Sequence, residues 1–334
     1  MNKKLFFLFT MVIVILFFSC NRKTIDSEKE ITLVMAEVNP ADTVVGRMDS
    51  AFKEKVEELS DGKIKIDLQF SGILGDEKQV MSLIMNKDSS IQLTRGPANL
   101  ASYSDLKLKS SLISVPYTFK NDEHFWQFAN SELAEEILDE PYKLGLGVKG
   151  LFYCEEGLRH YFSTTKIESV DDLKGKKMRI SGGVLTALSE SFNSEGVKVN
   201  FTDLYASLQM GKVEVAEQPI SNYLSNSFYQ VAPFLILDGH ILGAVSVMIN
   251  AECWDSLSQN QKNILIEAGK YAQDFCKKIV NETNQLATDI LRADGVKITE
   301  VTDKKPWQEA CAEMRKELVA VDPILYQKIL ELSN

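Results

Sequence analysis

Residues 169–180 read SVDDLKGKKMRI, and this stretch predicts a polar turn followed directly by a short strand. Serine, aspartate and glycine favour turns, so the first part is predicted to turn and residues 176–181 are predicted to form the strand. A helix is predicted over 185–192, immediately afterwards. Arg179 therefore lies in a strand that opens a β/α unit.

Further β/α units are predicted on both sides of this stretch. Downstream, short strands alternate with short helices over 197–231. Upstream, residues 31–94 follow the order β-α-β-α-β, in which Asn39-Pro40 opens a helix with one apolar face and residues 63–70 alternate as a half-buried strand does. This order predicts an α/β fold with helices covering a sheet.

The middle of the chain follows the same rules. It is predicted to contain a strand over 112–119, an amphipathic helix over 123–138 and a strand over 147–154. The β/α units after this point are shorter than those before it, and the chain has 334 residues. Both observations favour two packed lobes over one.

A long helix follows the second set of units. Ser258 and Gln261 form a capping box, and apolar residues recur with helical spacing from there to about Arg292, before Asp294-Gly295 ends the helix. At 1.5 Å per residue the helix measures about 50 Å. That length exceeds a single small lobe, so the helix is predicted to run along both.

The N-terminus carries an export signal. Lys3 and Lys4 precede the apolar run Leu5–Phe18, and Ser19-Cys20 follows it. A basic start, a short apolar segment and a small residue are typical of a secretory signal peptide. The cysteine after this run resembles the bacterial lipobox, which implies lipidation of Cys20; a soluble exported protein and an uncleaved signal anchor are the alternatives.

Composition excludes several function classes. The net charge of −10 argues against a nucleic-acid partner, and the three histidines are too scattered for a histidine-rich metal site. No nucleophile elbow, phosphate loop, dinucleotide motif or zinc-protease motif occurs, so neither an enzyme nor a cofactor is predicted. Besides Cys20, four cysteines occur without metal-type spacing, and their pairing stays open: Cys154, Cys253, Cys276 and Cys311.

Several short motifs occur in a characteristic order. They are G-x-R at 157–159, D-L-K-G-x-K-x-R at 172–179, Y-A-x-L-Q-x-G at 205–211 and Gln218-Pro219, preceded by Asn39-Pro40-Ala41 and by glycine-containing segments at 62–66 and 72–76. This order resembles the substrate-binding components of TRAP (tripartite ATP-independent periplasmic) transporters, the DctP-like family. The resemblance extends from about residue 31 to past residue 270.

The resemblance implies a two-lobe, periplasmic-binding-protein-like fold that closes on an organic anion. In that family an arginine of the K-x-R strand pairs with the substrate carboxylate, and the matching residue is Arg179. Arg159 matches a second arginine that often adds a contact. Gln218 stands beside the proline where the family usually has an asparagine, which leaves the carboxylate geometry and the ligand open. A guanidinium suits this role because its planar fork of donors fits a carboxylate in a bidentate way.

Three further candidates lie in the first lobe. Asn39 either contacts the ligand or caps the helix that follows it. Arg95 and Asn99 lie at a strand end, where α/β clefts recruit ligand groups, although a simple turn explains them equally.

The sequence therefore predicts an extracytoplasmic solute-binding protein, anchored to a bacterial membrane, that delivers a small carboxylate to a TRAP-type permease. The alternatives are a related receptor with an apolar ligand or a sensory role, and a secreted hydrolase. The predicted organisation is a signal peptide over 1–19, a lipidated tether over 20–30, lobe I over 31–156 plus about 245–284, and lobe II over 157–244 plus about 285–334.

Overall fold

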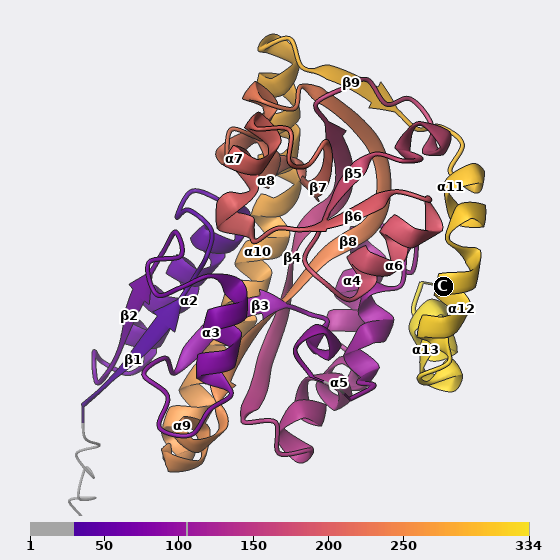
Figure 1. The fold of residues 1–334 in the computed structure, drawn as a ribbon. Helices are drawn as coiled ribbons and strands as arrows, with labels where there is room; N and C mark the ends of the chain where they lie inside the picture. Colours follow the sequence, from indigo (N-terminus) through magenta and orange to yellow (C-terminus); the bar gives the residue numbers. More distant parts are fainter. Residues whose placement is uncertain (1–29, 105, 334) are drawn as a thin grey trace, which may run out of the picture. The chain divides into compact units, whose positions relative to one another are not determined.

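The structure, a computed structural model, describes residues 30–104 and 106–333 (Figure 1). Cys20 and the predicted signal peptide lie outside the described residues. The strands are β1 (Ile31–Ala36), β2 (Ile64–Gln69), β3 (Leu93–Pro97), β4 (Val148–Ser163), β5 (Lys177–Ile180), β6 (Glu195–Lys198), β7 (Val215–Pro219), β8 (Phe234–Asn250) and β9 (Lys297–Glu300). The helices are α2 (Val44–Leu59), α3 (Glu77–Ile84), α4 (Asp122–Ala129), α5 (Glu132–Lys143), α6 (Val184–Ser191), α7 (Leu204–Gln209), α8 (Ile220–Ser225), α9 (Ala251–Ser256), α10 (Gln259–Ala293), α11 (Lys305–Ala310), α12 (Ala312–Val319) and α13 (Pro323–Glu331).

The strands form one mixed sheet in the order β2-β1-β3-β8-β4-β7-β5-β6, with β9 paired to β8. Parallel pairs occur at both ends, where β1 lies beside β2 and β5 beside β6. Parallel strands need crossover connections, and the helices α2 and α6 supply them. The predicted alternation in 63–70 is confirmed, because Ile64 and Ile66 are buried whereas Lys65 and Asp67 are exposed.

Two long antiparallel strands, β4 and β8, join the ends of this sheet. They pair from Val148 opposite Asn250 to Ser163 opposite Phe234, with three register shifts on the way. β3 pairs with the last part of β8, whereas β7 pairs with the last part of β4. The first β/α units therefore attach at one end of the long pair and the second units at the other (Figure 1).

Helix α10 contributes to the cores at both ends. Its first half buries Leu265 and Cys276 in the cluster that contains β1, β2 and α2, and its second half buries Ala287 and Leu291 in a cluster with β7 and α8. The capping box of Ser258 and Gln261 is present at its start. The prediction of one long helix running along both parts is confirmed.

The middle of the chain differs from the prediction in two ways. Residues 112–119 do not form a strand: the 3₁₀ helix Lys109–Ser114 and a turn occupy this segment. The helix over 123–138 is two helices, because the Ser131 hydroxyl caps a new helix by accepting the amide of Ala134 at 3.4 Å.

The start of the first helix and the strand β8 also differ from the prediction. Thr43, and not Asn39, caps α2, since its hydroxyl oxygen accepts the amide of Gly46 at 3.0 Å. A side chain on Gly46 would meet the carbonyl oxygen of Pro40 at 2.4 Å, which fixes this close turn. The 17 residues of β8 had no counterpart in the sequence-based assignment.

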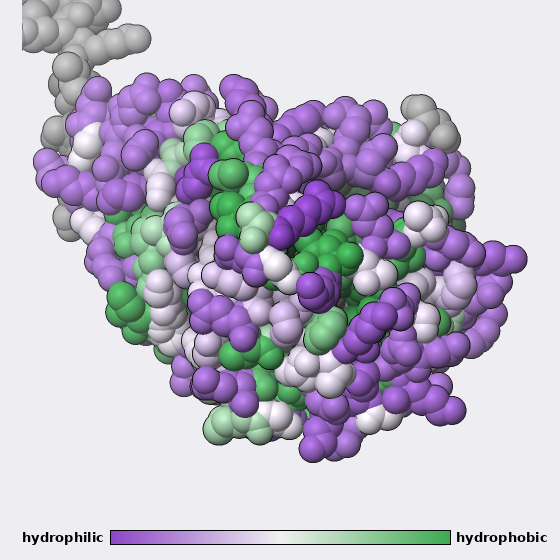
Figure 2. Space-filling model, turned by 90° about the horizontal axis from the view of Figure 1, so that it is seen from above, coloured by the Kyte–Doolittle hydropathy of each residue, from purple (hydrophilic) through white to green (hydrophobic). Residues whose placement is uncertain are grey.

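The described surface is mainly polar. Hydrophilic side chains dominate the face seen from above in Figure 2, with apolar groups between them. Among the described residues, no helix combines the length and the apolar character needed to cross a bilayer. The four cysteines of the described chain are free thiols, and three of them are buried: Cys154, Cys276 and Cys311.

Candidate functional site

A cavity of about 640 Å³ lies between the two ends of the sheet, with lining residues from both sets of β/α units. All six residues predicted for the site line it: Asn39, Arg95, Asn99, Arg159, Arg179 and Gln218. Arg95, Arg159, Arg179 and Gln218 lie on the strands β3, β4, β5 and β7, whereas Asn39 and Asn99 follow the ends of β1 and β3.

Arg179 differs from the other arginines of the cavity because its guanidinium has no carboxylate partner among the described residues. It is 5% exposed, and its Nε donates to the carbonyl oxygen of Val199 at 3.1 Å. Among the described residues, no carboxylate oxygen lies within 4.0 Å of its guanidinium, unlike those of Arg95 and Arg159. Burial lowers the pKa of Arg179, against the opposing effect of more distant carboxylates. A buried, unpaired guanidinium is a costly feature that an anionic ligand would relieve.

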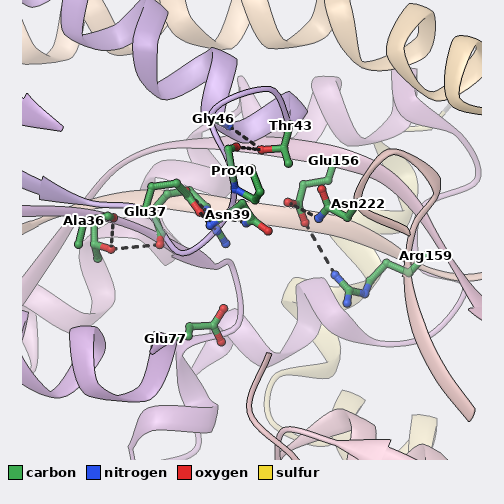
Figure 3. Close-up of polar contacts among 12 residues, drawn as sticks. Ala36, Glu37, Asn39, Pro40, Thr43, Gly46, Glu77, Glu156, Arg159 and Asn222 are labelled. Atoms are coloured by element: carbon green, nitrogen blue, oxygen red, sulfur yellow. Dashed lines mark hydrogen bonds and ion pairs between the residues drawn. The ribbon is translucent and has the colours of Figure 1, made fainter. Parts of the chain in front are cut away.

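Arg95 is paired in a bidentate way with a buried carboxylate that does not itself line the cavity. Its Nε donates to Glu37 Oε2 at 2.8 Å, and its Nη2 donates to Glu37 Oε1. Burial alone would raise the pKa of Glu37, but Arg95 lowers it overall. Asn39 is held by the same carboxylate, since its backbone amide and its Nδ2 donate to Glu37 Oε1 at 2.6 and 3.0 Å (Figure 3). Beside this pair, burial and Glu37 raise the pKa of Asp49 well above its usual range.

Arg159 is engaged in the same way by Glu217 of β7. Its Nε donates to Glu217 Oε2, and its Nη2 donates to Oε1 at 2.9 Å. Its Nη1 lies 3.8 Å from Glu156 Oε2, a contact drawn in Figure 3. Burial would raise the pKa of Glu217, but Arg159 and the neighbouring His240 lower it to about 2.

A buried histidine supports that carboxylate. His240 lies with Nδ1 2.7 Å from Asp238 Oδ2 and with Nε2 3.6 Å from Glu217 Oε2. Burial would lower the pKa of His240, but the two carboxylates raise it to about 9, so the imidazole is protonated at neutral pH. His160, also buried, accepts the amide of Gly239 on Nδ1 at 3.0 Å, and burial lowers its pKa to about 4.

The side-chain amides that line the cavity differ in whether they already have hydrogen-bond partners. Gln218 is 4% exposed, and no residue of the described chain bonds its side-chain amide. Asn99 Oδ1 accepts the amide of Ala101 at 3.1 Å, so this residue caps a turn and lines the cavity at once. Asn222, which the sequence-based prediction missed, donates to Glu156 Oε1 at 3.0 Å (Figure 3).

Two acidic residues at the start of α3 were also missed as site residues. Asp76 Oδ1 caps α3, while its Oδ2 accepts Asn200 Nδ2 from the other side of the cavity at 2.9 Å. Glu77 accepts the hydroxyl of Tyr103, and all four residues line the cavity: Asp76, Glu77, Tyr103 and Asn200. The segment 72–76 supported the family resemblance, but no sequence pattern indicates that the helix start faces the pocket.

The comparisons decide the family. Residues 35–322 match the family described as "Bacterial extracellular solute-binding protein, family 7", DctP. The chain belongs to this family. The resemblance to substrate-binding components of TRAP transporters that the motifs indicated is therefore confirmed. Members of the family bind solutes outside the cytoplasm for transport, so the chain is an extracytoplasmic binding protein and not an enzyme.

Two named relatives support the family assignment over most of the chain. The solute-binding protein NAS141_03721 of Sulfitobacter sp. NAS-14.1 is 26% identical over 75% of this chain and 72% of its own length. The 2,3-diketo-L-gulonate-binding periplasmic protein YiaO of Escherichia coli K12 is 24% identical over 81% of each chain.

A solved structure confirms the fold. The TRAP periplasmic solute-binding protein of Pseudomonas putida F1, solved with bound D-glucuronate, superposes with a TM-score of 0.84 at 24% identity, covering 90% of this chain and 96% of that one. The predicted α/β, two-lobe architecture is thus confirmed.

Proposed function

We propose that the protein captures a small organic acid by pairing its carboxylate with Arg179 and delivers it to a TRAP-type membrane permease. The observation that carries this proposal is the unpaired guanidinium of Arg179 in a cavity where Arg95 and Arg159 already have carboxylate partners. A ligand carboxylate supplies the missing counter-charge, and a bidentate pair in a partly dehydrated site is strong. Relatives named for 2,3-diketo-L-gulonate, sialic acid and C4-dicarboxylates fit this class of ligand.

The remaining predicted site residues complete this proposal. The free amide of Gln218 donates to the same carboxylate in place of the asparagine common in the family. Arg95, Asn39 and Asn99 contact the ligand from the first lobe, and Arg159 does so from the second. Because groups from both lobes then touch the ligand, binding favours the closed arrangement.

Calorimetric titration with organic acids tests the proposal. We expect Arg179→Met to lower affinity by about 30-fold or more, since losing one partner of a buried charged pair costs about 2–5 kcal/mol. Lys177→Met is the matched control, because Lys177 is an exposed cation on the same strand that does not line the cavity. Equal affinity in Arg179→Met and in the parent would remove the proposed mechanism, and binding of apolar solutes alone would favour the receptor alternative.

The division into lobes is part of the proposal. We infer that residues 31–156 plus about 245–284 form lobe I and residues 157–244 plus about 285–334 form lobe II, with the ligand between them. The separate hydrophobic clusters around β1–β3 and around β5–β7 support this division. Helix α13 packs Leu325 and Ile329 into the first cluster, so in this proposal the C-terminal segment returns from lobe II across lobe I.

We also propose that residues 1–19 are a signal peptide and that Cys20 is lipidated, tethering the protein to the membrane. The basic, apolar and small-residue order of the N-terminus carries this proposal. Metabolic labelling with an alkyne fatty acid should mark the parent and leave Cys20→Ser unmarked. Equal labelling of both would reject the assignment.

A further inference from the structure

The formal charges of the cavity lining and of the two carboxylates directly behind it cancel before any ligand enters. The charged lining residues are Asp76, Glu77, Lys78, Arg95, Glu156, Arg159, Arg179 and Lys198. Glu37 and Glu217, directly beneath the lining, neutralise Arg95 and Arg159. Lys78 and Lys198 are exposed, so solvent and salt screen them. One unpaired interior cation, Arg179, therefore remains.

Carboxylates face that cation within the same cavity. Glu77 is close enough to act on the pKa values of all three pocket arginines, Arg95, Arg159 and Arg179. Figure 3 shows its side chain turned toward the space that Asn39, Glu156 and Arg159 also border. The hydroxyl of Tyr103 fixes Glu77 by donating to Oε1, and no residue of the described chain donates to Oε2.

We propose that the pocket selects a polyhydroxylated monocarboxylate, such as a sugar acid, and that Glu77 is the residue that excludes dicarboxylates. The inference rests on the proposed role of Arg179 and goes beyond it by assigning the rest of the ligand. Glu77 accepts a ligand hydroxyl on its free oxygen, and carboxylate acceptors make strong hydrogen bonds of this kind. A second ligand carboxylate has no hydrogen to donate, so it meets Glu77 as a like charge.

The other acceptors of the cavity fit the same ligand. The Oδ1 atom of Asn222 is buried without a partner among the described residues. Glu156 accepts one hydrogen bond from Asn222 and lies 3.8 Å from Arg159. Burial raises the pKa of Glu156, because the charged carboxylate is poorly solvated there. Hydroxyl groups satisfy such acceptors, whereas a carboxylate leaves them unpaired.

Matched pairs of acids test the inference. D-Gluconate and D-glucarate share one carbon skeleton and differ only in a terminal hydroxymethyl or carboxylate group, as do D-galactonate and galactarate. In calorimetric titrations of the purified protein we expect the monocarboxylate of at least one pair to bind at least tenfold more tightly than its dicarboxylate. In Glu77→Gln we expect this ratio to fall at least tenfold, because glutamine keeps the shape and an acceptor but removes the charge.

Controls make the outcomes separable. Glu54→Gln carries the same substitution on an exposed face of α2, outside the cavity, and should keep the parent ratio. Tyr103→Phe removes the hydroxyl that fixes Glu77 and should lower the ratio less than Glu77→Gln does. Dicarboxylates that bind as tightly as their partners, or a ratio unchanged in Glu77→Gln, would overturn the inference and leave the organic-acid function standing. If none of these four acids binds but other organic acids do, the inference is overturned and the proposed function stands. If no organic acid of a wider panel binds, the proposed function itself is wrong, and the inference fails with it.

Discussion

Replacing each pocket arginine by methionine should change the stability of the ligand-free protein in different directions. Methionine matches the length of the arginine stem and carries no charge. Arg95→Met and Arg159→Met leave the buried carboxylates of Glu37 and Glu217 without their bidentate partners. Arg179→Met removes a charge that has no carboxylate within 4.0 Å in the described chain.

The magnitudes follow from burial and pairing. Breaking a buried ion pair by removing one partner costs about 3–5 kcal/mol, so Arg95→Met and Arg159→Met should lower the free energy of unfolding by that amount. The Arg95 side chain is 4% exposed, whereas the Arg159 side chain is 19% exposed, so Arg95→Met should be the more damaging. Arg179→Met loses one hydrogen bond to Val199, worth about 1 kcal/mol, and relieves an unpaired buried cation. We expect the Arg179→Met variant to be as stable as the parent or about 1 kcal/mol more stable.

Urea unfolding of ligand-free protein measures these differences. Native mass spectrometry should first confirm that dialysis from denaturant has removed any ligand, because a ligand that binds only the folded state stabilises it. Lys177→Met, on the same strand as Arg179 and exposed, should stay within about 0.5 kcal/mol of the parent. A loss of 3 kcal/mol or more in Arg179→Met would refute the reasoning, since it would show that this guanidinium is a structural group with partners.

Two further predictions concern stability. Burial raises the pKa of Glu155 from 4.5 to about 8, so the folded state binds its proton more tightly, and the stability that Glu155 contributes below pH 4.5 is lost as the pH rises through 8. Glu155→Gln should remove this loss, which amounts to up to about 1.4 kcal/mol per pH unit. Urea unfolding of the parent and the variant from pH 5 to 9 measures it, and parallel curves of the free energy of unfolding against pH would contradict the prediction. Gly269→Ala should destabilise by about 1–3 kcal/mol despite alanine's better helix propensity, because the new Cβ meets Phe152 at 2.6 Å; an unchanged or higher melting temperature would show that Phe152 yields.

Local periodicity predicted those elements that bury one face. The helix with apolar residues from Val44 to Leu59 and the strand over 64–69 carry their own signals, because each alternates between core and solvent. β8 lacks that signal: all of its 17 residues are buried or half-buried, so neither of its faces is open to solvent. A strand that is covered on both faces shows no alternation for a sequence pattern to detect.

The site residues also fall into two groups: those that a sequence motif marks and those that no sequence pattern marks. Arg179, Arg159 and Gln218 were predicted because a family motif marks them, and the structure places all three on the cavity. Glu77 was not predicted, because its place at the start of α3 is equally well explained by the usual preference for acidic residues in a first helical turn. The sequence also cannot show that Glu217 neutralises Arg159, because the two residues are 58 positions apart and meet only through β4–β7 pairing.

Three arginines in one cavity suggest a highly cationic site, and the buried carboxylates change that conclusion. Glu37 and Glu217 each hold a guanidinium in a fixed plane, and His240 in turn holds Glu217. Arg95 and Arg159 can therefore present their remaining N–H donors at fixed positions without adding net charge to the pocket. Such donors suit hydroxyl oxygens, because a neutral oxygen accepts a directed hydrogen bond and carries no charge that a cation must balance. Under the proposed function, the unpaired guanidinium of Arg179 binds the ligand anion, and the two neutralised guanidinium groups contact the rest of the ligand.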